Sequence, residues 1–270
     1  MKKMVVFLCC LLAAAGVVYA AGGKEAAGGD DSLNKIIEKK KFVLGLDDSF
    51  PPMGFRDENN EIVGYDVDLA KEVARRVGVE LVLQPIDWNA KEQELNTGEI
   101  DCIWNGFTIT PERAKALTFS KPYLKNAQVV VVRANSGYKT LDSLSGKIAG
   151  IQAGSSAAEA LDSAVEFKAS LKDVVEYKEN LTALMDLEVS GIDAVIMDLI
   201  VANDAIKRSG KNFLILEESL APEEYGIGFR KADIALRNKV QEVLEAMAAD
   251  GTAAKISTKW LGADISIIGK

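Results

Sequence analysis

The chain of 270 residues contains no histidine. This absence excludes serine–histidine and cysteine–histidine catalysis, and it excludes metal sites built on imidazole ligands. Cysteine is also scarce, because Cys9 and Cys10 lie close to the N-terminus and only Cys102 stands in the rest of the chain. One cysteine cannot form an internal disulfide. The apolar residues on both sides of Cys102 favour an inert buried thiol over a reactive one.

Positive charge is in the minority, with 32 Lys and Arg against 40 Asp and Glu and a net charge of −8. Such a chain is unsuited to nucleic acid or to an anionic membrane surface. The acidic pairs at 30–31 and 47–48 lack the spacing of metal ligands, so the sequence predicts no metal and no other cofactor. The 48% of hydrophobic residues and the length predict a globular protein of one large domain or two ordinary ones.

A long apolar run occurs only at the start of the chain. Two lysines precede the apolar or small residues at 4–18, and the run ends in Val-Tyr-Ala, which predicts a signal peptide over 1–20 and an extracytoplasmic or periplasmic location. The run is shorter than the ~20 residues of a spanning helix, although an uncleaved anchor is the alternative. Residues 21–32 are rich in glycine and alanine and predict a flexible linker. Cys9 and Cys10 stand too early for an expected lipid anchor.

Strand patterns alternate with helix patterns in the rest of the sequence. Apolar segments at 41–46 and 80–85 predict strands, and between them the apolar spacing over 66–77 predicts a helix that Asp66 would cap. A longer amphipathic helix is expected over 234–249. This alternation predicts an α/β fold with a mainly parallel sheet.

Three groups of short motifs follow one another: FPPMGF at 50–55 with GYDVDLA at 64–70, GEID at 98–101 with NGFTITPER at 105–113 and FSKPY at 119–123, and QAGSS at 152–156 with DAVIMD at 193–198. In this order and spacing they resemble the type 3 family of periplasmic solute-binding proteins, which are the amino-acid-binding components of ABC importers. The resemblance covers the chain from about Leu33 to about Leu261.

The resemblance implies a two-lobed periplasmic-binding-protein fold of type II. Each lobe would be a sheet flanked by helices, and two hinge strands would cross between them near 124–128 and 224–228. Lobe 1 would comprise residues 33–125 and 228–270, and lobe 2 residues 126–227. The partners it implies are a free L-amino acid and ABC permease subunits, and we expect a monomer.

A free amino acid needs charged partners for its carboxylate and its ammonium group in a closed cleft. Arg113 suits the carboxylate because its planar fork donates two parallel bonds; the alternative is a solvated surface charge. Ser155 and Ser156 stand where a strand turns into a helix, and free N–H groups there favour anions. An ordinary serine-capped helix start is the alternative.

Asp198, at the end of the buried strand at 192–198, could pair its carboxylate with the ammonium group of the ligand. It could also cap the helix that follows. The resemblance adds the carbonyl of Gly106 and the hydroxyl of Thr108 to this part of the site. Asn105 stands where relatives often have serine. The neighbouring acidic pair at 223–224 is expected on the surface.

The side-chain pocket is expected to decide which amino acid binds. Phe50 and Trp88 occupy positions whose aromatic rings flank the ligand in relatives of this family, and two rings favour a flat or cationic group. Asp47 would favour a basic or amide side chain, and Gln152 would supply a further polar contact. Core packing is the alternative for Phe50.

We therefore expect a binding protein, not an enzyme, that captures a polar L-amino acid of the basic or amide kind by hinged closure and delivers it to an ABC importer. A ligand sensor that signals to a membrane receptor is one alternative, and a dehydratase on the same fold is another. Carboxylate chemistry is possible without histidine, so measured product formation would separate the enzyme from the binding protein.

Overall fold

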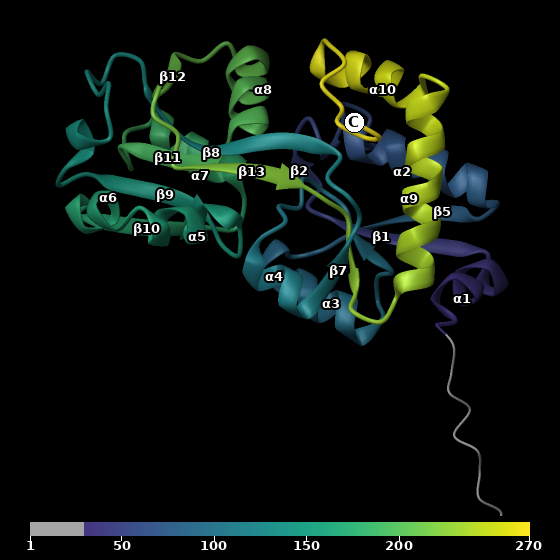
Figure 1. The fold of residues 1–270 in the computed structure, drawn as a ribbon. Helices are drawn as coiled ribbons and strands as arrows, with labels where there is room; N and C mark the ends of the chain where they lie inside the picture. The colour runs from purple at the N-terminus through teal and green to yellow at the C-terminus, as the bar shows by residue number, and fades with distance from the viewer. Residues whose placement is uncertain (1–29) are drawn as a thin grey trace, which may run out of the picture.

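The computed structural model describes residues 30–270 and shows two α/β lobes joined by a pair of strands (Figure 1). The predicted signal peptide at 1–20, and the predicted linker as far as residue 29, lie outside the described residues. Ser32, the end of the predicted linker, is the first residue of a helix. No helix within residues 30–270 is both long and apolar enough to cross a membrane.

Lobe 1 is built on a five-stranded sheet, with a three-stranded sheet beside it. The large sheet has the order β5 (Glu80–Pro85), β1 (Lys41–Leu46), β6 (Cys102–Ile103), β14 (Gly228–Arg230), β7 (Leu117–Phe119). The small sheet consists of β2 (Ser49–Phe50), β3 (Gly54–Arg56) and β4 (Ile62–Val63). The helices of this lobe are α1 (Ser32–Lys39), α2 (Tyr65–Val77), the 3-10 turn η1 (Trp88–Ala90), α3 (Lys91–Thr97), α4 (Pro111–Ala116), α9 (Ile234–Ala249) and α10 (Thr252–Leu261).

Lobe 2 is built on a second sheet, which has helices packed around it (Figure 1). The strand order is β10 (Asp173–Tyr177), β9 (Ile148–Gln152), β11 (Ala194–Asp198), β8 (Leu124–Arg133), β12 (Phe213–Ile215), and β13 (Ala221–Tyr225) pairs with the first half of β8. The helices are η2 (Asp142–Leu144), α5 (Ser156–Ser163), α6 (Val165–Ser170), α7 (Asn180–Glu188) and α8 (Leu199–Ser209).

The two lobes are connected by β8 and β13, which lie side by side between them (Figure 1). The strands are antiparallel, and their register pairs Leu124 with Tyr225 and Gln128 with Ala221. The predicted crossing at 124–128 coincides with the start of β8, and the one at 224–228 overlaps the end of β13. The predicted lobe limits stay a prediction. The paired strands hold the start of lobe 2 and the return to lobe 1 next to each other.

Local sequence signals predict several elements correctly. The strands at 41–46 and 80–85 and the helix at 234–249 have the predicted bounds. Cys102 is fully buried in β6, as expected, and burial raises the pKa of its thiol. The prediction of a mainly parallel sheet is only partly correct. Strand β1 is parallel to β5 and β6, and β9 is parallel to β10 and β11. The pairs that contain β8 or β14 are antiparallel; β8 and β13 cross between the lobes, and β14 follows the return to lobe 1.

The prediction that Asp66 caps helix α2 is wrong. The helix begins at Tyr65, and Gly64 takes the cap position with φ of 147°. Asp66 lies one residue further on and is fully buried, where its Oδ2 accepts hydrogen bonds from the Gly106 N–H (2.7 Å) and the Tyr123 hydroxyl (2.9 Å). Burial raises the pKa of Asp66 to about 7. Its carboxyl group therefore fixes the loop at Gly106 from a helix 40 residues earlier in the chain.

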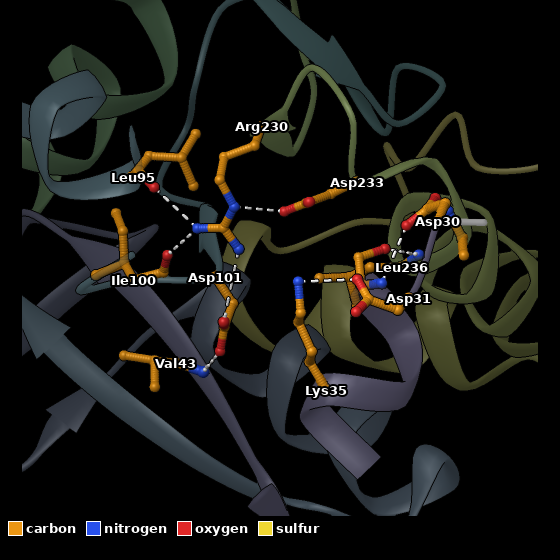
Figure 2. Close-up of polar contacts among 12 residues, drawn as sticks. Asp30, Asp31, Lys35, Val43, Leu95, Ile100, Asp101, Arg230, Asp233 and Leu236 are labelled. Atoms are coloured by element: carbon orange, nitrogen blue, oxygen red, sulfur yellow. Dashed lines mark hydrogen bonds and ion pairs between the residues drawn. The ribbon is translucent and has the colours of Figure 1, made fainter. Parts of the chain in front are cut away.

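A polar cluster joins the return segment to the first strands of lobe 1 (Figure 2). Buried Asp101 accepts hydrogen bonds from the Val43 N–H (2.7 Å) and from Lys39 Nζ (2.7 Å). Arg230 on β14 lies 3.8 Å from the same carboxylate and binds Asp233 at 2.6 Å. Because Arg230 follows the second crossing, this cluster fixes the returning chain against β1 and β6.

Candidate functional site

Side chains of the two lobes contact each other directly where the predicted ligand residues lie. Gln152 Nε2 in lobe 2 donates to Asp47 Oδ2 in lobe 1 over 2.7 Å. The Ser156 hydroxyl donates to Thr108 Oγ1 over 3.1 Å. We call this junction the interlobe site; it comprises Asp47, Phe50, Asn105, Gly106, Thr108 and Arg113 from lobe 1 and Gln152, Ser155, Ser156 and Asp198 from lobe 2.

Arg113 is a buried cation of this site, and a solvated surface charge is excluded because its residue is only 6% exposed. Thr110 accepts a hydrogen bond from the Arg113 N–H and Pro111 occupies the first helical position, so the start of α4 fixes the direction of the side chain. The guanidinium donates to the Thr108 carbonyl (2.9 Å) and to the Gly154 carbonyl (3.2 Å). Its carbon lies 4.6 Å from the centre of the Phe107 ring. Burial lowers the pKa of Arg113.

The turn before α5 brings lobe 2 to this guanidinium. Ser155 caps the helix by accepting a hydrogen bond from the Ala157 N–H, as in the ordinary cap that was one alternative, whereas the Ser156 hydroxyl reaches Thr108 across the lobes. Gly154 adopts φ of 70°, and a Cβ there would lie 2.9 Å from Asn89 Oδ1 of lobe 1. This turn therefore needs glycine both for its backbone and for the approach of the lobes.

A pair of carboxylates forms the opposite end of the site. Asp198 at the end of β11 is 5% exposed and accepts hydrogen bonds from the Tyr225 hydroxyl and from Asn126 Nδ2, each at 2.6 Å. It occupies the cap position of α8 but makes no side-chain cap bond. Burial, and then the charge of Glu223, raises the pKa of Asp198 to about 7.

The expected surface position of Glu223 is wrong. The carboxylate accepts hydrogen bonds from Thr108 Oγ1 (3.1 Å), Asn126 Nδ2 (3.0 Å) and Gln128 Nε2 (3.0 Å). Strand β13 alternates in exposure, with Glu223 half-buried and Glu224 exposed. Glu223 therefore belongs to the interlobe site, which sequence reasoning missed, although the period of two in a strand was a usable signal.

The loop at 105–108 connects the two ends of the site. Asn105 Oδ1 accepts a hydrogen bond from the Asp47 N–H (3.1 Å), whereas its buried Nδ2 has no acceptor among residues 30–270. Gly106 adopts φ of 58°, and a Cβ there would lie 2.9 Å from Cε1 of the Phe50 ring. Asn105 and Gly106 are therefore held beside the predicted side-chain pocket.

The two predicted aromatic residues occupy different places. Phe50 is buried next to Gly106, within the interlobe site. The Trp88 ring packs edge-on against the Phe107 ring with centroids 5.7 Å apart. The guanidinium of Arg113 lies over the Phe107 ring. The structure thus places Trp88 behind Arg113, and a direct contact between Trp88 and a ligand stays a prediction.

Sequence reasoning also missed a buried lysine, Lys91. Lys91, the first residue of α3, is 5% exposed, and its Nζ donates to the Gly154 carbonyl across the lobes (2.8 Å). No pattern in the sequence around Lys91 gave a reason to single out this lysine. Only the folded structure brings Lys91 to the carbonyl that Arg113 also contacts.

Two α/β lobes, paired crossing strands and charged side chains that meet between the lobes define a periplasmic-binding-protein fold. The sequence model of bacterial extracellular solute-binding proteins, family 3, matches residues 42–263. The chain therefore belongs to this family, as the motifs indicate.

Among curated proteins, the chain is 33% identical over 236 residues to the L-cystine-binding protein TcyJ of Escherichia coli strain K12, a match that covers 87% of each chain. It is 32% identical over 226 residues to the ABC transporter arginine-binding protein 1 of the same strain, which covers 82% of this chain and 90% of that protein. Both relatives are named as amino-acid-binding proteins.

The similar solved structures are also amino-acid-binding proteins. The L-arginine complex of Tv2483 is 36% identical, with a TM-score of 0.86 over 90% of this chain and 99% of that one. A substrate-binding protein of an ABC uptake transporter from Streptococcus pneumoniae, with bound histidine, is also 36% identical, with a TM-score of 0.86 over 88% and 99% of the two chains. These similarities confirm the two-lobed fold.

Proposed function

We propose that this protein captures a basic L-amino acid between its lobes and delivers it to the permease of an ABC importer. The observation that carries the proposal is the charge of the site. Asp47, Asp198 and Glu223 contribute three carboxylates to the interlobe site, whereas Arg113 and Lys91 contribute two cations. A zwitterion with one further positive charge matches this balance, whereas an amide side chain leaves one carboxylate without a cation.

Each end of a bound amino acid finds a partner of opposite charge in this arrangement. Arg113 offers its planar fork to the carboxylate. Asp198 and Glu223 face the ammonium group, and its positive charge would keep both of them ionised. The Asp47 carboxylate, beside the ring of Phe50, would receive the basic side chain. A ligand bound in this way touches both lobes only when they are closed, so it favours the closed form.

Binding without chemistry is part of the proposal. The relatives named above are binding proteins. A structure described as the ancestral amino-acid-binding protein AncCDT-1, a precursor of cyclohexadienyl dehydratase, is 30% identical with a TM-score of 0.78. Enzymes have thus arisen near this fold, and the raised pKa of Asp198 would suit a proton donor. A product assay on each ligand that binds tests whether the protein turns any of them over.

Export and assembly are further parts of the proposal. We infer that residues 1–20 direct export, that the mature protein works outside the cytoplasmic membrane, and that it acts as a monomer. The same cleft would also serve a sensor that signals to a membrane receptor. N-terminal sequencing of the exported protein tests the cleavage, and reconstituted uptake with the cognate permease separates transport from sensing.

Isothermal titration calorimetry with L-arginine, L-lysine, L-histidine, L-glutamine and L-cystine tests the ligand class. We expect arginine or lysine to bind most tightly. The variant Glu223→Gln should weaken arginine and glutamine alike, by about tenfold or more, because it removes one of the two carboxylates that face the ammonium group common to both ligands. Glu224→Gln, the exposed neighbour on the same strand, is the matched control. Tightest binding of glutamine or cystine would contradict the basic class.

A further inference from the structure

The environment of Lys91 is unusual for a lysine. Its ammonium group is buried, and it donates to two backbone carbonyls: that of Trp88 in its own lobe (3.1 Å) and that of Gly154 in lobe 2 (2.8 Å). It forms no ion pair with any carboxylate among residues 30–270. Burying a charge without a counter-ion is costly, so a lysine in such a place needs a reason.

A second buried cation lies beside it. Arg113 Nη2 donates to the same Gly154 oxygen over 3.2 Å, so a guanidinium and an ammonium group converge on one carbonyl. The carboxylates of Asp87, Glu92 and Glu159 act on Lys91 only at longer range. Burial, and next the charge of Arg113, lowers the pKa of Lys91 to about 8. Two like charges therefore meet in a desolvated corner where neither forms an ion pair with a carboxylate among residues 30–270.

The missing negative charge is the one that a ligand would bring. We propose that Lys91 is a second cation for the carboxylate of the bound amino acid, which stabilises that carboxylate electrostatically beside Arg113 while it holds the Gly154 turn of lobe 2. This inference rests on the proposed function, because it places the carboxylate of the amino acid at Arg113. Lys91 is a positioning and charge-balancing residue, and Arg113 makes the direct contact.

The competing explanation is that Lys91 is a latch, which stabilises the closed lobes whatever the charge of the ligand. The two roles differ in one measurable way. A latch stabilises the closed form equally for every ligand, whereas a second cation matters only for a ligand that carries the carboxylate. L-Argininamide keeps the ammonium group and the side chain of arginine but replaces the carboxylate by a neutral amide, so it separates the roles.

The test is calorimetric titration of L-arginine and L-argininamide into the wild-type protein and Lys91→Met. We expect Lys91→Met to weaken arginine about tenfold more than it weakens argininamide, because the lost bond to Gly154 affects both ligands whereas the lost charge affects only the ligand that carries a carboxylate. Lys115→Met is the matched control, because this lysine on α4 is exposed and pairs with Glu112. It should change neither affinity.

Equal losses for the two ligands would identify a latch and overturn the inference, and so would unchanged affinities. Lys91→Arg keeps the charge and should keep the wild-type ratio of the two affinities. If Lys91→Met does not fold, as judged by circular dichroism, Lys91→Gln removes the charge while it keeps a hydrogen-bond donor, and it must give the same contrast. If the wild-type protein binds no amino acid, the proposed function fails and this inference fails with it.

Discussion

Replacing Asp198 by asparagine should make the ligand-free protein more stable at pH 8 while it abolishes ligand binding. The side chain is buried, and its carboxylate accepts hydrogen bonds from Tyr225 and Asn126 while the charge of Glu223 lies nearby. Ionising such a group costs free energy that the unfolded chain does not spend. Asparagine has a similar shape and no charge, so it removes that cost.

The magnitude follows from the pKa of Asp198, which rises from 3.8 to about 7 on folding. Below pH 3.8 the group is protonated in both states and costs nothing. As the pH rises from 3.8 towards 7, the unfolded chain loses the proton first, so the free energy of unfolding falls. About three pKa units correspond to about 4 kcal/mol above pH 7. Asparagine loses about 1–2 kcal/mol of hydrogen bonding, which leaves a gain of about 2–3 kcal/mol.

Thermal unfolding by circular dichroism at pH 4 and pH 8, with and without ligand, measures this effect. At pH 8 the ligand-free Asp198→Asn variant should melt several degrees above the wild-type protein, since about 1 kcal/mol shifts the midpoint by about 2–4 °C in a chain of this size. At pH 4 the difference should reverse, with the variant melting below the wild-type protein, because only the loss of hydrogen bonding remains there; at neither pH should ligand raise the midpoint of the variant. Glu224→Gln is the exposed control. A lower midpoint than wild type at pH 8, or the same difference at both pH values, would refute the reasoning.

Two further predictions concern closure and the stability of lobe 1. Gly154→Ala should weaken ligand binding at least tenfold in calorimetry, because the added Cβ would meet Asn89 when the lobes are closed. It should also lower the ligand-free melting midpoint by a few degrees, because the left-handed backbone of the turn disfavours alanine; unchanged affinity would show that the lobes do not approach as described. Asp101→Asn should lower the free energy of unfolding in urea by about 1–3 kcal/mol, because the bonds to Val43 and Lys39 weaken, and should keep the ranking of ligands; a stability equal to wild type would contradict a structural role for this cluster.

The fold was predictable where its signals are local or where a family resemblance was available. The strand at 41–46 and the helix at 234–249 follow from the spacing of apolar residues alone. The incorrect prediction that Asp66 caps its helix arose because the decisive contact is not local. An aspartate at the start of an apolar pattern is typical of a cap, but its partner, the Gly106 N–H, lies 40 residues away and decides the outcome. A local pattern contains no information about such a partner.

Candidate site residues could be named from the sequence, but their contacts could not. The Thr110-Pro111 start of α4 predicts where Arg113 leaves the helix, and the structure bears out its burial. The bond between Asp47 and Gln152 spans 105 residues and depends on the closure of two lobes, so no sequence pattern indicates it. Glu223 was missed for another reason. A pair of adjacent acidic residues is usually exposed, but the alternation of side chains along a strand points Glu223 and Glu224 to opposite sides.

The arrangement of charge also explains why closure would depend on a ligand. Lys91 and Arg113 meet at one corner and Asp198 and Glu223 at the other, so like charges lie side by side at both ends of the interlobe site. Burial of such pairs is unfavourable until opposite charges are added. A zwitterion supplies both of them at once, the carboxylate to the cations and the ammonium group to the carboxylates. The free energy that opposes closure of the ligand-free protein is therefore the same free energy that a bound amino acid releases, which couples binding to closure through the charges themselves.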